Sequence, residues 1–111
     1  MKISENCQAK LKDLISKTLL TERDDRGLTH DDVAFLADLT RTCVQNIEYK
    51  KNLTGFETFF LLEEAMQLSD DESIDLYMEL RAHVREDRRR QREEAGTQHL
   101  AERLWNGKRK K

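Results

Sequence analysis

The sequence predicts an all-α protein, and three observations lead to that fold class. The 111 residues include no proline and only four glycines, so few turns interrupt the chain. Apolar residues recur three and four positions apart over several stretches, which is the spacing of one buried helical face. No stretch alternates apolar and polar residues in the way that a half-buried β-strand does.

The composition excludes several classes of protein. Charged residues make up 38% of the chain and aromatic residues 6%, a balance that suits a small helical protein with a thin core. No stretch approaches the roughly 20 apolar residues of a membrane span, and the N-terminus lacks the apolar segment of a secretory signal. We therefore expect a cytoplasmic protein without a membrane partner.

The residues that could carry chemistry are too scattered to predict an enzyme. The sequence shows no nucleophile–base constellation and no glycine-rich phosphate loop. No pair of cysteines or histidines has zinc-ligand spacing, so we expect neither a metal site nor a cofactor. We interpret Cys7 and Cys43 as two small, partly buried thiols. A redox role for Cys43 is the alternative interpretation.

Three helices are predicted before residue 50. The first covers residues 5–24, with Ser4 as its N-cap. The second covers residues 30–37 and the third covers residues 41–49, with a tight turn between them. The apolar spacing predicts that the following side chains face the core: Cys7, Leu11, Leu14, Ile15, Thr18 and Leu19 in the first helix, Val33, Ala34, Leu36 and Ala37 in the second, and Val44 and Ile47 in the third.

The two short helices have the features of a DNA-reading unit. Thr29 and Thr40 are N-cap residues, because each hydroxyl can accept an otherwise unpaired N–H of the first helical turn. The third helix buries only two apolar side chains and is otherwise polar. Polar side chains of this kind can bond to base edges in a major groove, as in a helix-turn-helix. The outward positions are Arg41, Thr42, Gln45 and Asn46.

These residues belong to a longer stretch that resembles the Xre/Cro family, the lambda-repressor-like helix-turn-helix proteins. The resemblance runs without a gap from residue 28 to residue 69. The ungapped register over some forty residues is more specific than any one match. The matching positions are Leu28-Thr29, Val33-Ala34, Thr40-Arg41-Thr42, Val44, Ile47-Glu48, Lys51 and Phe56-Glu57-Thr58-Phe59.

The resemblance implies a five-helix domain that reads double-stranded DNA. It implies that Arg41, Thr42 and Asn46 reach bases, with Gln45 beside them, and that Glu48 orients a neighbouring side chain. The expected function is a transcriptional regulator of bacterial or phage type, a repressor that binds a palindromic operator as a homodimer. The residues expected to meet phosphates are His30, Thr40, Lys50 and Lys51.

The sequence departs from the family pattern at three positions. Asp38, Lys50 and Gln67 stand where the family usually has glycine. Residues 28–69 also carry three basic and seven acidic side chains, which weakens their attraction for DNA. A protein-binding adaptor or antitoxin-type module, acting through the C-terminal helices, is therefore the alternative function.

The last forty residues exceed what the five-helix domain needs. Residues 56–67 are predicted as a fourth helix with a mainly buried aromatic face, from which Phe60 is left over. A fifth helix covers residues 71–92 or beyond, and its arginine-rich second half has no apolar side chain to bury. A short sixth helix covers residues 98–105. We assign residues 1–70 to the DNA-binding domain, residues 71–105 to a helical extension that forms the homodimer, and residues 106–111 to a disordered basic tail. The dimer contacts are predicted at Ile74, Tyr77, Met78, Leu100, Leu104 and Trp105.

Overall fold

The computed structural model describes residues 2–109, and within that range the chain forms six helices and no strand. The predicted all-α fold class is therefore confirmed. The predicted elements recur within a few residues at each end. The last helix runs four residues beyond its predicted end, so residues 106–109 are helical and the prediction of a disordered tail is wrong for them, while residues 110–111 lie outside the described residues. The helices are α1 (Glu5–Asp25), α2 (His30–Ala37), α3 (Arg41–Glu48), α4 (Phe56–Ala65), α5 (Asp70–Ala95) and α6 (Gln98–Arg109).

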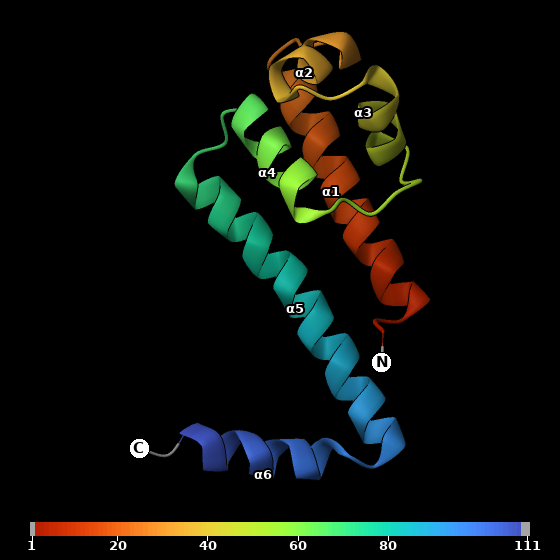
Figure 1. Ribbon diagram of the computed structural model, residues 1–111, viewed down its shortest axis with the longest axis vertical. Coiled ribbons are helices and arrows are strands. Elements are labelled where there is room, and N and C mark those ends of the chain that lie inside the picture. Colours follow the sequence, from red (N-terminus) through yellow and green to blue (C-terminus); the bar gives the residue numbers. More distant parts are fainter. Residues whose placement is uncertain (1, 110–111) are drawn as a thin grey trace.

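The molecule is elongated because its last two helices form an arm. Figure 1 shows α2, α3 and α4 gathered around one end of α1, with α5 extending past the start of α1 and α6 leaving at the other end of the molecule. The principal extents are 49 × 31 × 20 Å and the radius of gyration is 17.1 Å. A compact chain of this length would have a radius of gyration of about 13 Å. The helix-turn-helix unit and α6 thus lie at opposite ends of the long axis.

Local sequence explains where the helices begin and end. Ser4, Thr29, Thr40 and Ser69 each precede a helix, and each hydroxyl accepts a hydrogen bond from an N–H three residues on. Left-handed backbone occurs at the three non-glycine positions that depart from the family pattern. Their φ angles are 56° at Asp38, 62° at Lys50 and 53° at Gln67. The turns therefore keep the geometry that glycine usually supplies, at a cost in strain.

The core lies where the first four helices meet. Val33 and Val44 are fully buried at its centre. The prediction that Leu36 is buried is wrong, because its side chain is 47% exposed. Residues 33, 34 and 37 already fill the inward face of α2. Phe56 is 78% exposed, since it begins α4 outside the packed region, and Phe60 is exposed as predicted. The core cluster comprises Ile15, Leu19, Val33, Ala34, Ala37, Val44, Ile47, Leu62, Ala65 and Met66.

The second half of α5 buries one side chain, which contradicts the prediction that it buries nothing. Asp87 is only 3% exposed, although no apolar residue surrounds it in the sequence. Its carboxylate accepts hydrogen bonds from the Ser4 backbone N–H at 2.9 Å and from the Ser4 hydroxyl at 2.5 Å. Gln91 donates to the carbonyl of Lys2 at 3.0 Å. The start of α1 supplies donors to a carboxylate, so α5 is attached to α1 by polar contacts.

Replacing Asp87 with alanine should loosen the start of α1 without unfolding the core. The Ser4 donors would lose their acceptor, and the cap would no longer be held against α5. Amide hydrogen exchange in the first two turns of α1 should accelerate by roughly tenfold. Glu93→Ala on the same helix is the matched control, because Glu93 contacts only the exposed Arg89 side chain. Equal exchange in both variants would show that the Asp87 contact does not hold α1.

Candidate nucleic-acid interface

The helix-turn-helix unit consists of α2, α3 and the turn between them, and its caps and core contacts orient both short helices. The Thr40 hydroxyl accepts from the Cys43 N–H at 3.0 Å and starts α3 in a defined direction. The buried side chains of Val44 and Ile47 then orient α3 on the core. The other face of α3 is left to solvent. It carries Arg41 and Thr42, which are exposed, and Gln45 and Asn46, which are partly exposed.

Glu48 fastens the end of α3 to α1. Its carboxylate accepts two hydrogen bonds from the Arg23 guanidinium, at 2.7 Å and 3.0 Å, and the Ser16 hydroxyl donates to its carbonyl at 2.6 Å. The two charged side chains are 5% and 14% exposed, respectively. Burial alone would raise the pKa of Glu48, but the hydrogen bonds from Arg23, together with the nearby His30 ring, outweigh it and hold that pKa below its usual value. Glu48 thus has the orienting role that the family resemblance implies.

His30 is turned toward this buried pair. Its Nε2 atom lies 3.2 Å from a Glu48 carboxylate oxygen, and its ring meets the edge of Tyr49 at a centroid distance of 6.2 Å. The imidazole therefore faces the Arg23–Glu48 pair, and its phosphate contact stays a prediction. A phosphate at this place would meet the backbone N–H groups that begin α2, where the helix dipole favours an anion.

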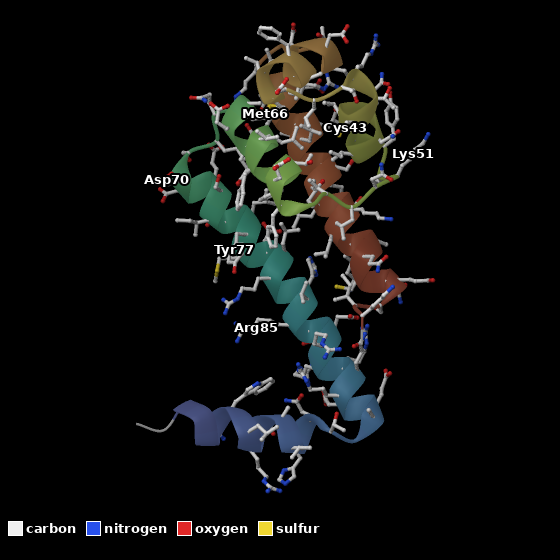
Figure 2. The ribbon with its side chains drawn as sticks, viewed as in Figure 1. Cys43, Lys51, Met66, Asp70, Tyr77 and Arg85 are labelled. Carbon is white, nitrogen blue, oxygen red and sulfur yellow. The ribbon has the colours of Figure 1, made fainter. Side chains whose placement is uncertain are left out.

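The other residues predicted to contact phosphates differ in whether they already have a partner within the protein. Lys50 donates to Asp13 of α1 at 2.5 Å, so binding a phosphate requires it to leave or share that carboxylate. Lys51 is exposed and points away from the domain in Figure 2, without an ion pair among the described residues. Thr40 uses its oxygen as the cap acceptor, which leaves its hydroxyl hydrogen free to donate.

An acidic side chain borders the outward face of α3, which carries Arg41, Thr42, Gln45 and Asn46. An Arg41 guanidinium nitrogen lies 3.7 Å from the Asp31 carboxylate, and both side chains are more than half exposed. Asp32 serves as the capping-box residue of α2, so its carboxylate is held at the Thr29 N–H. At least one carboxylate, that of Asp31, therefore lies next to the outward side chains of α3.

The six predicted dimer residues are all half-exposed. Ile74, Tyr77 and Met78 lie on α5, while Leu100, Leu104 and Trp105 lie on α6. The Arg92 guanidinium covers the Trp105 ring at 4.9 Å from the ring centroid. The sequence reasoning did not foresee this contact or the exposure of Phe35 and Phe56. The spacing of thirteen residues between Arg92 and Trp105 gives no helical signal, because a glycine turn separates them.

Two further findings limit the chemistry of the described residues. Their histidine, cysteine and acidic side chains form no group of three or more that could hold a metal ion. In the same part of the chain, no helix is both long and apolar enough to span a membrane.

Comparison with known proteins supports the fold. No family model and no curated protein matches the sequence. A solved structure does match: the crystal structure of a tyrosine-to-phenylalanine mutant of the restriction-modification controller protein C.Esp1396I. The two chains are 22% identical, the match covers 75% of this chain and 95% of that chain, and the TM-score is 0.51. The likeness covers almost all of the other chain, and we conclude that this chain has the all-helical fold of that controller protein.

Proposed function

We propose that the protein is a sequence-specific, double-stranded-DNA-binding transcriptional regulator. The observation that carries this proposal is the short α3 helix, which is fixed by two buried apolar residues and by Glu48 and which presents polar side chains outward. The controller protein with the similar fold is consistent with this function. As a repressor, the protein would occupy promoter DNA, and as a homodimer it would read a palindromic operator.

The chemistry of the outward side chains suggests which bases they contact. Arg41 has a planar fork of donors that matches O6 and N7 of guanine, and Asn46 matches N6 and N7 of adenine. Thr42 and Gln45 add single hydrogen bonds on the same helix. Each good bidentate pair contributes roughly 1–3 kcal/mol of discrimination against a wrong base. Two copies of this face would therefore read two short half-sites.

Phosphate contacts should supply a modest share of the affinity. Thr40, Lys50 and Lys51 are the expected donors, together with the N–H groups that begin α2. Each neutralised phosphate adds roughly 0.9 to the slope of log affinity against log salt. Two lysines per copy thus predict a slope of about four in a dimer, which is smaller than that of strongly basic DNA-binding proteins.

The function is tested by fluorescence anisotropy with DNA from upstream of the protein's own gene. Affinity for that duplex should fall by roughly 10²- to 10³-fold between about 50 and 200 mM salt. A shuffled duplex of the same composition is the control and should bind much more weakly at either salt concentration. Equal affinity for the two duplexes would contradict sequence-specific binding.

Removing the carboxylate beside Arg41 should strengthen DNA binding. Asp31→Asn keeps the size of the side chain but frees the Arg41 guanidinium and removes a negative charge near the phosphates. Because the Arg41–Asp31 contact is long and exposed, we expect only a roughly two- to fivefold gain in affinity. Asp25→Asn, beyond the helix-turn-helix unit, is the matched control for charge. A loss of affinity in Asp31→Asn would place Asp31 among the DNA-contacting residues.

The exposed apolar residues of α5 and α6 favour a second candidate, a protein-binding adaptor or antitoxin-type module. Apolar side chains gathered on an extended arm indicate an interface. Light scattering separates the two candidates: a chain that is dimeric without DNA uses this surface for itself. A monomer that fails to bind its upstream DNA would favour the adaptor.

A further inference from the structure

The face of α5 that points away from α1 has two oppositely charged halves. Figure 2 shows Tyr77 and Arg85 on this side of the helix. The acidic half is residues 70–80, which contain five carboxylates and no basic side chain. The arginine half is residues 81–92, which contain six arginines and two carboxylates. A helix divided in this way is complementary to an antiparallel copy of itself.

The arginine half lines a hollow together with α6. Arg85, Arg88 and Arg92 border this arginine hollow, and Gln98 and Trp105 border it from α6. In the described part of the chain these three arginines form no ion pair, although Arg92 stacks on Trp105 and Arg88 donates to Gln91. Arg89 also borders the hollow, but its guanidinium pairs with Glu86 and Glu93. The other three arginines supply positive charge that intramolecular carboxylates do not neutralise.

The acidic half carries the complementary set of groups. Ile74, Tyr77 and Met78 are 57%, 54% and 50% exposed. Asp71 and Asp75 flank them and, like the three arginines, have no ion-pair partner among the described residues. Positions 74, 78, 81, 85 and 92 follow the three-, four- and seven-residue spacing of one helical face. The apolar residues of the acidic half therefore lie in line with the arginine hollow.

The solvent-accessible surface of the chain also exceeds that of a compact monomer of the same mass. The accessible surface is 7968 Å². A compact protein of this mass exposes roughly 6,400 Å². The excess is roughly 1,600 Å², while an interface of standard size covers about 800 Å² on each partner. The arm thus leaves enough surface uncovered for a stable dimer.

We propose that two copies pair through antiparallel α5 helices, with the acidic half of each lying in the arginine hollow of the other. The proposal rests on the homodimer proposed above and adds the surfaces and orientation. With the pairing centred on Leu80, Asp75 faces Arg85, because both lie equally far from residue 80, and Asp71 lies next to the position that faces Arg88. A parallel pairing would place like charges together. Two-fold symmetry makes every contact twice.

The pairing also gives α6 a role. In the antiparallel arrangement, the α6 helix of one copy lies beside the first turns of the other copy's α5. Trp105 then meets the exposed Ile74 and Tyr77 side chains of the second copy, which are the apolar residues nearest to its acidic end. The charges set the orientation, and these apolar contacts supply much of the buried area.

Complementary charge reversals test the pairing in the absence of DNA. One chain carries Asp71→Arg with Asp75→Arg, and the other carries Arg85→Glu with Arg88→Glu. Each chain alone should dimerise at least tenfold more weakly than the wild type by light scattering, because its acidic-half and arginine-half contacts become repulsive. An equimolar mixture should restore a dimer that contains one copy of each, as native mass spectrometry would show.

The outcomes separate this proposal from the DNA-binding proposal. Full dimerisation of each reversed chain, or a mixture that stays monomeric, would overturn the reciprocal pairing and leave DNA binding untouched. Trp105 is the sole tryptophan, so its fluorescence tests the wild-type chain directly. Its emission should change as the dimer dissociates on dilution, and more salt should shift that transition to higher protein concentration. An emission spectrum that changes with neither dilution nor salt concentration would also overturn the pairing, whatever the variants show.

Discussion

Replacing Glu48 with alanine should lower the free energy of unfolding by about 3–5 kcal/mol. The variant leaves the Arg23 guanidinium almost buried and without its carboxylate, and it removes the hydrogen bonds that fasten α3 to α1. Losing one partner of a buried pair costs more than the net value of the pair, because the remaining charge is no longer compensated. Urea denaturation followed by circular dichroism measures the difference.

Glu64→Ala is the control for this substitution. Glu64 is exposed near the end of α4, so its replacement should change stability by no more than about 0.5 kcal/mol. A Glu48→Ala protein as stable as this control would show that the Arg23–Glu48 pair does not hold α3. The Glu48→Ala substitution should also weaken DNA binding, because a loosened α3 no longer presents its outward side chains in a fixed direction.

The pH dependence of stability gives a second view of the same residue. Arg23 and His30 keep the pKa of Glu48 below the ordinary glutamate value of 4.5. The unfolded chain therefore takes up the proton more readily, and the pair stabilises the fold above that ordinary value. This stability is lost as the pH falls through the lowered pKa. The difference between wild type and Glu48→Ala should accordingly shrink below about pH 4.

Placing charges in the apolar part of the α5 face should abolish the dimer and most operator binding. Ile74→Glu with Met78→Glu changes two side chains that are half-exposed in the single chain, so the fold should survive. A dimer gains operator affinity because the second half-site binds at a high effective concentration. We expect an operator affinity 10²- to 10⁴-fold weaker in this variant, with little change on a shuffled duplex. Light scattering and anisotropy measure the two effects.

Phe35→Glu is the matched control for the dimer. Phe35 is 84% exposed on α2 and lies outside the proposed α5 and α6 interface. Like the α5 variant, the Phe35→Glu variant has glutamate in place of an exposed apolar side chain, but it should remain a dimer. If Phe35→Glu dissociates the dimer and the α5 variant does not, the interface lies on the helix-turn-helix end of the molecule.

Local signals predicted most of the fold. The caps at Thr29 and Thr40 fix the two short helices because each involves atoms three residues apart. The buried Val33, Val44 and Ile47 follow from helical spacing alone. The family resemblance added the role of Glu48, whose partner Arg23 lies on another helix and could not be found by spacing.

Contacts between distant segments account for what the sequence did not predict. Asp87 is buried only because Ser4, 83 residues earlier, brings a hydroxyl and an N–H to its carboxylate. His30 faces inward because Glu48 offers it a partner, which the local pattern of α2 does not show. Leu36 satisfies the helical spacing but lies at the edge of the packed face. In each case the outcome depends on tertiary packing, which the spacing of residues along a single helix does not report.

The most direct measurement of the central claim is a base-by-base binding profile for wild type and Arg41→Ala. Each base pair of the bound duplex is replaced in turn, and the affinity of both proteins is measured. Arg41→Ala should lose about 1–3 kcal/mol on the unaltered duplex and become indifferent to one guanine in each half-site, with the other positions unchanged. An Arg41→Ala profile identical to that of the wild type would contradict DNA reading by α3.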